Sequence, residues 1–433
     1  MKNNNISWSG FSKKTPAERT AHLQKHELLS KASQQSLNTQ EMLSLDRADQ
    51  ITENVFSRLA LPFSLAPDFL INGQTYQVPF VTEEPSVVAA ASFAAQIIKR
   101  SGGFTVQVHN RQMISQLVLY DVPDKEKAKK AILAEKSRLL SLANQAYPSI
   151  VKRGGGACDL SAEIKDDFLI LYLIADTKEA MGANIMNTMT EALAAPIEDL
   201  AGGQTLMAVL SNYATQALVT AECEVKLHFL SRNKEQAQVF ARKIALASQL
   251  AQIDVYRAST HNKGIFNGID AVVLAAGNDW RAIEAGGHTY ACKDGQYRGL
   301  STWTYDAGNN SLKGSLTLPM PTATKGGSIG LNPSVRLAHD LLGKPSAQEL
   351  AGIITAVGLA QNFAALKALT STGIQAGHMK LQAKSLALSA GASEDETAPV
   401  VSQLLKARHM NLETAESILR MLRKQQGQDS SLE

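Results

Sequence analysis

Cysteine is scarce in this sequence: three residues in 433, too few and too widely spaced for a disulfide framework. Cys158, Cys223 and Cys292 form no Cys-x-x-Cys pair, so a zinc finger or zinc ribbon is also excluded and no metal site is expected. Free thiols are typical of a reducing compartment, which predicts a cytoplasmic protein. The first fifteen residues contain no apolar run suited to a signal peptide, and the apolar run at 168–175 is too short to span a bilayer, so we expect no membrane association.

An excess of one charge is also missing. The chain has 43 Lys and Arg residues against 40 Asp and Glu residues, which gives a formal net charge of +3. No stretch combines basic with aromatic residues in the way that a nucleic-acid-binding surface requires, so nucleic acid is not an expected partner. Hydrophobic residues make up 44% of the chain, which excludes a mainly disordered protein, and the length predicts two or three domains.

The two common nucleotide fingerprints, Gly-x-Gly-x-x-Gly and the P-loop, are both absent. The candidate that remains is the junction at 176–184, between an apolar strand and a helix. Gly182 lets a ligand approach the backbone closely, and the free N–H groups at the start of a helix suit a pyrophosphate. Taken alone, a glycine at a helix start more often serves packing than binding.

Helical and strand patterns alternate along the chain. Helical spacing occurs at 39–55, 85–100, 124–147, 182–200 and 234–253, and from 346 to the C-terminus, while strand patterns occur at 104–122, 168–175 and 222–230 and around Trp303 and Leu316. The glycines around Lys263 predict a loop where the backbone can approach a ligand. We predict a large domain at 1–109 and 216–375, interrupted by a small α+β domain at 110–215 and followed by a helical segment at 376–433.

Four stretches resemble one known family. Glu-Ala-Met-Gly-Ala-Asn at 179–184 is similar to the Asp-Ala-Met-Gly-x-Asn segment of the 3-hydroxy-3-methylglutaryl-CoA (HMG-CoA) reductases. The other three are VTEEPSVVA at 81–89, HNKGIFNGID at 261–270 with GNDW at 277–280, and GIQAGHM at 373–379. All four occur in family order over nearly the whole chain, and the length is similar to that of the soluble, bacterial class II enzymes.

The resemblance implies a fold and an activity. The expected α+β fold has a large mixed α/β substrate domain, a small nucleotide-binding domain of ferredoxin-like rather than Rossmann topology, and a C-terminal helical flap. The expected reaction converts HMG-CoA to mevalonate and CoA through a mevaldehyde-level intermediate, with two reduced nicotinamide cofactors. A homodimer or higher homo-oligomer, with the active site between subunits, is also implied.

Chemistry explains which residue types such a site needs. Each hydride transfer builds negative charge on a carbonyl oxygen, so a fixed cation is required near that oxygen, and each reduction also consumes a proton. The resemblance assigns Lys263 to the oxygen, Glu84 to proton delivery, Asp279 to a carboxylate linking these two, and His378 to protonation of the departing CoA thiolate. Without the resemblance, Lys263 is read as a surface lysine, Asp279 as a helix N-cap and His378 as a packing or surface residue.

The resemblance also assigns binding residues. Arg257 is expected to hold the free carboxylate of the substrate, a task suited to a guanidinium, and Arg19 to contact a CoA phosphate. Expected substrate contacts are Ser86, Asn212 and Asn267, and expected cofactor contacts are Glu179, Ala180, Met181, Gly182, Ala183, Asn184 and Thr188. Glu179 departs from the usual Asp of the family segment.

The choice of cofactor follows from charge. A carboxylate at the adenosine ribose favours NADH, because it repels the extra phosphate of NADPH. The corresponding stretch at 142–147 contains no acid, and Lys152 and Arg153 follow shortly after it. We therefore predict NADPH, with NADH as the alternative. A non-redox CoA-thioester hydrolase or transferase, or a CoA-ester-binding protein on the same scaffold, is the alternative function.

Overall fold

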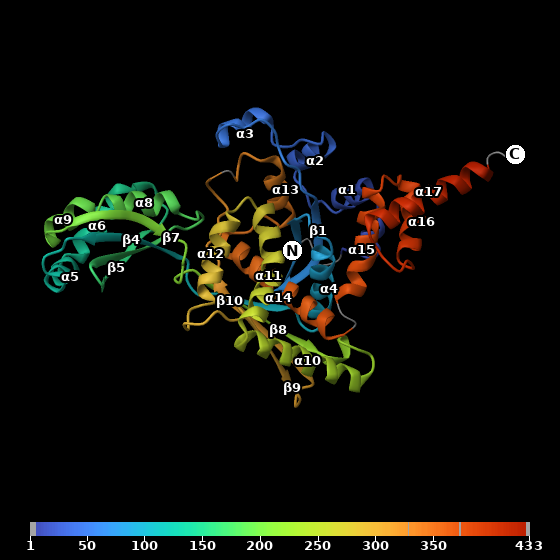
Figure 1. The fold of residues 1–433 in the computed structure, drawn as a ribbon. Coiled ribbons are helices and arrows are strands. Elements are labelled where there is room, and N and C mark those ends of the chain that lie inside the picture. The colour runs from blue at the N-terminus through green and yellow to red at the C-terminus, as the bar shows by residue number, and fades with distance from the viewer. Residues whose placement is uncertain (1–5, 328, 372–373, 430–433) are drawn as a thin grey trace.

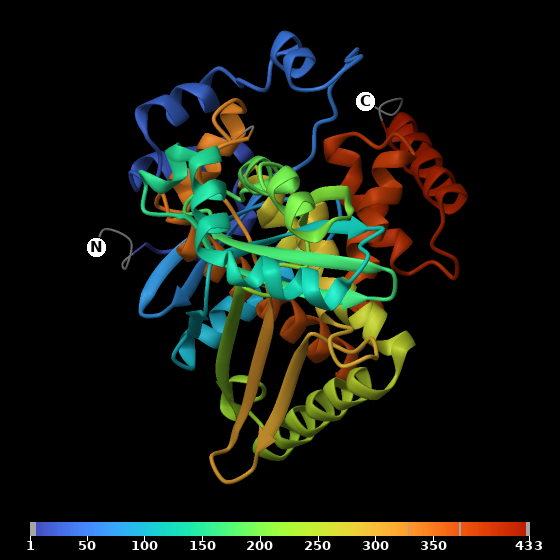
Figure 2. The same cartoon turned by 90° about the vertical axis from the view of Figure 1, so that its left-hand side faces the viewer.

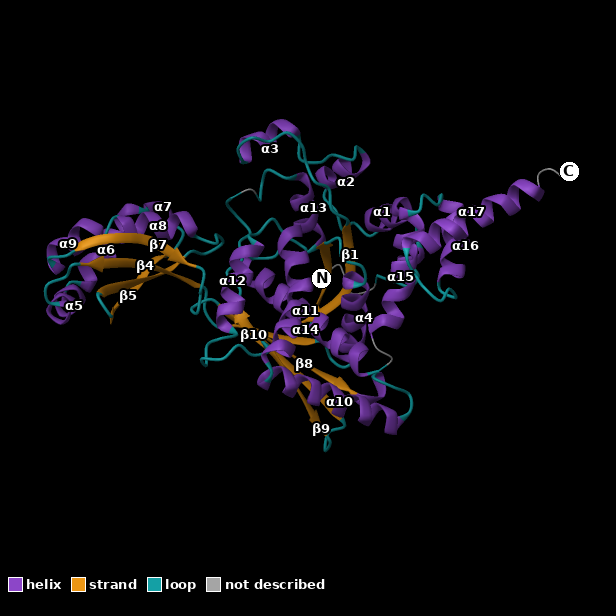
Figure 3. Cartoon of the chain, in the orientation of Figure 1, coloured by secondary structure: helices purple, strands orange, loops and turns teal. Residues whose placement is uncertain are grey.

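The computed structural model describes residues 6–327, 329–371 and 374–429, except for the side chains of 374–381 and 426–429. The described residues form two β-sheets, and most of the helices pack against one sheet or the other (Figures 1 and 3). The smaller sheet and its helices stand to one side of the larger sheet, and the last three helices stand to the other (Figure 1). The turned view shows the small sheet in front of the large one (Figure 2).

The large sheet has six strands in the order β2-β1-β3-β8-β10-β9. Their bounds are β1 Phe63–Ile71, β2 Gln74–Val81, β3 Phe104–Val108, β8 Leu218–Lys226, β9 Ser301–Asp306 and β10 Ser311–Pro319. Neighbouring strands are antiparallel, except that β1 and β3 are parallel. The helices that pack on it or beside it are α4 Val87–Arg100, α10 Lys234–Ile253, α11 Val255–Ala275, α12 Trp280–Tyr290, α13 Pro333–Leu341 and α14 Ala347–Thr370, and a short 3-10 helix, Leu227–Phe229, follows β8.

Helix α14 lies at the centre of the large domain. Among the described residues it alone is long and apolar enough to cross a membrane by length and composition. However, 89% of its most apolar window is buried inside the protein, as expected for the core helix of a globular domain. Gly358 lets α14 pack closely against α11, because a Cβ on this residue would lie only 2.9 Å from Ile269 Cδ1 of α11.

The small domain has a four-stranded antiparallel sheet in the order β5-β6-β4-β7. Its strands are β4 Gln112–Tyr120, β5 Gly156–Lys165, β6 Phe168–Asp176 and β7 Gln204–Ser211, and its helices are α5 Lys125–Ala134, α6 Lys136–Ala146, α7 Pro148–Val151, α8 Ala183–Glu191 and α9 Ala194–Ala201. Helices separate β4 from β5 and β6 from β7, which is the ferredoxin-like βαββαβ pattern. The predicted ferredoxin-like topology is therefore confirmed.

The C-terminal region is helical, as predicted. It consists of α15 Ile374–Ser389, α16 Glu394–Leu404 and α17 Leu412–Asp429. These helices bury a small apolar cluster of their own, which includes Ala387, Val400, Leu404, Ile418 and Leu419. Because this cluster is separate from the core of the large sheet, the three helices form a distinct packing unit.

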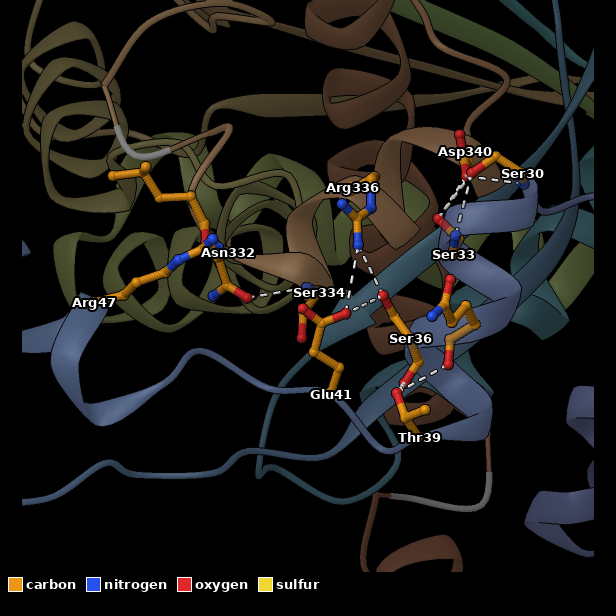
Figure 4. Close-up of polar contacts among 12 residues, drawn as sticks. Ser30, Ser33, Ser36, Thr39, Glu41, Arg47, Asn332, Ser334, Arg336 and Asp340 are labelled. Carbon is orange, nitrogen blue, oxygen red and sulfur yellow. Dashed lines mark hydrogen bonds and ion pairs between the residues drawn. The ribbon is translucent and has the colours of Figure 1, made fainter.

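The N-terminal segment contains a 3-10 helix at Phe11–Lys13 and helices α1 Pro16–Lys25, α2 Lys31–Asn38 and α3 Leu45–Ile51. Polar contacts fasten it to α13 (Figure 4). The carboxylate of Asp340 accepts hydrogen bonds from the Ser30 backbone N–H at 3.0 Å and from the Ser33 hydroxyl at 2.6 Å. Arg336 donates to the Ser36 hydroxyl at 2.7 Å. These bonds join the N-terminal segment to α13.

Several sequence predictions of local structure are wrong. The helix predicted at 39–55 is reduced to α3, because its predicted apolar face has no core to cover: Met42, Leu45 and Ile51 are all exposed. The helices predicted at 124–147 and 182–200 are each interrupted, near Glu135 and near Leu193. The loop predicted around Lys263 is also wrong, since this lysine lies inside α11.

Candidate active site

Glu84 and Lys263 meet although 179 residues separate them in the chain. Glu84 lies in the turn between β2 and α4, and Lys263 lies on α11. The Lys263 ammonium donates a hydrogen bond to Glu84 Oε2 at 2.5 Å. The two side chains are 60% and 37% exposed, so the charge pair is open to a ligand.

Asn267 completes this cluster. It lies one helical turn after Lys263, so both side chains leave α11 on the same face. Its amide donates to Glu84 Oε1 at 3.2 Å, so each oxygen of this carboxylate has a donor. Three of the predicted site residues are thus brought together by two separate elements.

Ser86 is the N-cap of α4, two residues after Glu84. Its backbone is left-handed, with φ of 73°, and its hydroxyl makes no capping hydrogen bond. A serine rarely adopts this conformation without compensation, and such strain is concentrated at functional sites. The hydroxyl is therefore available beside the Glu84 turn.

The glycines near Lys263 serve packing rather than a loop. A Cβ on Gly268 would lie 3.0 Å from Val357 Cγ1 and 3.2 Å from Gln361 Cβ, both on α14. A glycine at this position therefore lets α11 and α14 approach closely. The sequence suggested a loop because helix packing and backbone exposure both favour glycine.

Asp279 acts as an N-cap in this chain. Its Oδ1 accepts hydrogen bonds from the backbone N–H groups of Arg281 and Ala282 at 3.1 and 3.3 Å, and from Arg281 Nε at 3.2 Å. In the described part of the chain, no hydrogen bond or ion pair joins it to Lys263 or Glu84. The predicted bridge between those residues is therefore not formed here, and the Asp279 hydrogen bonds, all made by Oδ1, go to donors at the start of α12.

Arg257 lies six residues before Lys263 on the same helix. At about 100° per residue, this spacing places the two side chains on different faces of α11. The Arg257 side chain is half-buried, and burial lowers the pKa of its guanidinium. Burial, with a smaller contribution from Arg257, lowers the pKa of His261 to about 3, so this histidine is neutral and hydrogen-bonds to the Ser301 hydroxyl.

The remaining predicted residues are dispersed. Asn212 follows β7, and its carbonyl lies against α12, where a Cβ on Gly286 would be only 2.6 Å away. Arg19 donates to the carbonyl oxygens of Phe11 and Ser12, so it holds the N-terminal segment together. His378 lies on α15, and its side chain is outside the described residues.

The predicted cofactor segment forms a tight turn between β6 and α8. The Thr177 hydroxyl donates to the Ala180 carbonyl at 2.8 Å, and the Ala180 N–H donates to the Thr177 carbonyl at 3.1 Å. Gly182 is the N-cap of α8, with φ of 101°, and a Cβ there would lie 2.3 Å from Thr177 Cγ2. Only glycine fits this position, and no side chain of the N-cap residue accepts from the N–H groups in the first turn of α8.

Polar side chains follow this turn. Asn184 and Thr188 are exposed and lie one turn apart on one face of α8. Lys152 and Arg153, both exposed, follow α7. Lys178 lies close by, since a Cβ on Gly154 would be 3.9 Å from its Cε. Lys152 and Arg153 thus lie in the chain just before Gly154, which is beside Lys178 of the turn that leads into α8.

Glu179 behaves differently from the rest of the cofactor segment. Its carboxylate accepts hydrogen bonds from the Thr324 hydroxyl and from the backbone N–H of Ala347, at the start of α14. Arg111 was not singled out from the sequence, yet its guanidinium donates to the carbonyls of Lys178 and Ala180. No motif identifies Arg111, since its role depends on carbonyls brought together only by folding.

The chain is similar in sequence to proteins of one family along most of its length. Residues 15–383 match the hydroxymethylglutaryl-coenzyme A reductase family. The 3-hydroxy-3-methylglutaryl-coenzyme A reductase of Archaeoglobus fulgidus is 41% identical over 385 residues, which are 88% of this chain and 87% of that protein. The probable 3-hydroxy-3-methylglutaryl-coenzyme A reductase of Borreliella burgdorferi is 36% identical over 332 residues, 76% of this chain and 75% of that one.

Solved structures of the same family are also similar to this chain. The 3-hydroxy-3-methylglutaryl-coenzyme A reductase of Streptococcus pneumoniae has a TM-score of 0.84 and 62% identity, and the match covers 96% of this chain and all of that one. A structure of the class II enzyme from the same organism, bound to NADPH in open conformations, has a TM-score of 0.83 with 84% of this chain covered and all of that one.

These similarities define the chain as an oxidoreductase of α+β fold, whose smaller sheet has ferredoxin-like rather than Rossmann topology. The chain belongs to the hydroxymethylglutaryl-coenzyme A reductase family.

Proposed function

We propose that this protein reduces HMG-CoA to mevalonate and CoA, using two molecules of NADPH. The observation that carries the proposal is the cluster of Lys263, Glu84 and Asn267, within a chain of this family. A cation, a proton donor and an amide at one point are what the reduction of a thioester requires.

Each residue has a role in the proposed reaction. The Lys263 ammonium stabilises negative charge on the substrate oxygen, and its exposure lets the thioester reach it. Glu84, held by Lys263 and Asn267, supplies the proton. His378 protonates the departing CoA thiolate, which needs an acid that titrates near neutral pH.

Asp279 joins this cluster in the proposal. All three of its hydrogen bonds use Oδ1, and Oδ2 has no partner among the described residues. The second oxygen therefore remains available to Lys263 when substrate or a partner subunit completes the site. Ser86, Asn212 and Arg257 are proposed to contact the substrate, and Arg19 to contact CoA.

The cofactor site is proposed at the start of α8. Gly182, where a Cβ would collide with Thr177, lets the chain turn sharply into α8, and the N–H groups in the first turn of that helix, which have no partner within the helix, suit a pyrophosphate. Ala180, Met181, Ala183, Asn184 and Thr188 would line it, while Glu179 supports it from behind. NADPH supplies the hydride when bound, and the related Streptococcus pneumoniae structure is described as bound to NADPH. Lys152 and Arg153 would hold the phosphate that distinguishes NADPH from NADH.

A homodimer is part of the proposal. Phe56 and Leu59 are 91% and 89% exposed, and their segment leads into β1 beside the Glu84 turn, where the Thr82 N–H donates to the Pro62 carbonyl. Tyr256, at the start of α11, is 84% exposed. Apolar side chains so exposed beside a site are typical of a subunit interface, so we infer that a second copy covers them.

We also propose the division into domains predicted above, with a small domain at 110–215, and a C-terminal flap at 376–433 that brings His378 to the site. The chain crosses between the two sheets at 109–111 and 212–217, which supports this division. Three free cysteines support a cytoplasmic location.

One assay tests the proposal against a non-redox thioesterase. Purified protein is incubated with HMG-CoA and NADPH while nicotinamide absorbance and CoA thiol release are followed together. The proposal predicts loss of absorbance that requires HMG-CoA. Release of CoA without any change in absorbance would establish hydrolysis instead.

A further inference from the structure

The loop at 320–325, which we call the junction loop, follows β10 and hydrogen-bonds to the cofactor segment of the small domain. The Met320 N–H donates to the Ala217 carbonyl at 2.9 Å, and Arg111 donates to the Thr322 carbonyl. The same Arg111 guanidinium donates to the carbonyls of Lys178 at 2.5 Å and Ala180 at 3.1 Å. One partly buried arginine therefore ties the cofactor segment to the large domain.

Glu179 makes the second tie. Its backbone carbonyl accepts hydrogen bonds from the N–H groups of Thr324 at 2.9 Å and Lys325 at 3.2 Å. Its carboxylate Oε2 accepts from the Thr324 hydroxyl and, at 2.9 Å, from the Ala347 N–H. Ala347 is the first residue of α14, so this carboxylate satisfies a free N–H and faces the positive end of the helix dipole.

The junction loop also contacts the residue next to Asp279. The Ala323 N–H donates to Asn278 Oδ1 at 2.6 Å, and Asn278 Nδ2 donates to the Ala323 carbonyl at 3.0 Å. This paired hydrogen bond fixes the backbone at the start of α12. A continuous series of bonds thus runs from Glu179 through the junction loop to the position that precedes Asp279.

We propose that Glu179 is a positioning residue that clamps the cofactor segment to the junction loop and so sets the cofactor in register with Asp279 and Lys263. This inference rests on the proposed function. In this role the Glu179 side chain has to be long, because its carboxylate extends across the domain boundary to the start of α14 instead of toward the cofactor.

The physical consequence falls on cofactor binding. Without the clamp, the cofactor segment adopts its competent position for only part of the time, and the apparent affinity for NADPH falls by that fraction. The affinity for the thioester is set elsewhere, around Lys263 and Glu84, and is expected to stay unchanged. A purely structural role would instead reduce both in parallel.

The test compares Glu179→Ala with Glu179→Gln. The glutamine keeps an oxygen that can accept from both Thr324 and Ala347, whereas the alanine removes it. We expect Glu179→Ala to raise the KM and Kd for NADPH about tenfold or more, with the KM for HMG-CoA within about twofold, and Glu179→Gln to restore most of the loss. Glu191→Ala, an exposed residue on α8, is the matched control and is expected to behave like the parent protein.

A double-mutant cycle adds a direct measure of coupling. Thr324→Val removes the hydroxyl that donates to Glu179, so it should add little when Glu179→Ala is already present. Fully additive effects, an unchanged KM for NADPH in Glu179→Ala, or failure of Glu179→Gln to restore it would each overturn the clamp. A parent protein that oxidises no NADPH would overturn the proposed function itself, and the clamp with it.

Discussion

Lys263 Nζ and Glu84 Oε2 lie 2.5 Å apart, joining the face of α11 to the turn that follows β2. The position of each depends on the large sheet, since α11 packs against β2 and α14 supports α11 from behind. The pair remains accessible at the surface of a rigid core. This arrangement suits a catalytic cluster better than a stabilising ion pair, because exposed ion pairs contribute little to stability.

Loss of either member should strongly reduce turnover without unfolding the protein. We expect Lys263→Ala and Glu84→Gln each to lower kcat roughly 100- to 1000-fold, because each removes charge stabilisation or proton delivery. The free energy of unfolding should change by less than about 1 kcal/mol, since the pair is partly exposed. Steady-state kinetics and urea unfolding measure the two effects. Near-normal turnover in either variant would remove that residue from the proposed mechanism.

Charge beside α8 should control the choice of cofactor. Reversing Lys152 and Arg153 together to glutamate should lower kcat/KM for NADPH relative to NADH by about tenfold or more, because it replaces attraction to the phosphate by repulsion. Reversal of Lys129 and Lys130 on α5 makes the same change in net charge and serves as the control. A ratio that does not change in the first variant, measured at fixed ionic strength, would place the phosphate elsewhere.

The pair formed by Asp270 and Glu284 should make stability depend on pH. Burial, together with the charge and hydrogen bond of Glu284, raises the pKa of Asp270 well above its usual range. The folded protein therefore holds a proton that the unfolded chain has released, and stability is lost as pH rises from the unfolded pKa through the folded one. Asp270 lies on α11 and Glu284 lies on α12, so the pair lies between these two helices.

We expect Asp270→Asn to flatten this dependence. Between pH 5 and pH 8, the free energy of unfolding of the parent should fall relative to the variant, by at most about 1.4 kcal/mol per pH unit. Urea unfolding at several pH values measures it, with the exposed Asp199→Asn as control. Parallel curves for parent and Asp270→Asn would show that the proton is not held.

Two glycines of α11 should respond oppositely to substitution. Gly264 has no heavy atom within 4 Å of a built Cβ, so Gly264→Ala should stabilise the protein by up to about 1 kcal/mol through helix propensity. A Cβ on Gly268 would lie 3.0 Å from Val357 Cγ1, so Gly268→Leu should destabilise by about 1–3 kcal/mol through overpacking. Urea unfolding at one protein concentration compares them. Stabilisation by both substitutions would mean that α11 and α14 do not need the close approach.

The sequence predicted part of this architecture for clear physical reasons. The bounds predicted for α10 coincide with the observed helix, because its start and end are marked by an N-cap at Asn233 and by Asp254. The apolar run at 168–175 correctly predicted β6, in which buried side chains alternate with partly exposed ones. The ferredoxin-like topology came from the family resemblance rather than from periodicity.

Other features depend on contacts that no local pattern contains. The glycines around Lys263 look like a loop in sequence, and only the packing of Gly268 against α14 explains them. Glu179 resembles a cofactor ligand by its motif, yet its carboxylate bonds to Thr324 and Ala347, far along the chain. Arg111 binds three carbonyl oxygens that only the folded chain brings together.

The stoichiometry of the complete reaction tests the central claim most directly. Purified protein is given limiting HMG-CoA and excess NADPH, and NADPH oxidised, CoA released and mevalonate formed are all measured at completion. The account predicts two NADPH oxidised for each CoA and each mevalonate, because reducing a thioester to an alcohol takes two hydrides. CoA released with no NADPH oxidised, or with no mevalonate formed, would contradict it.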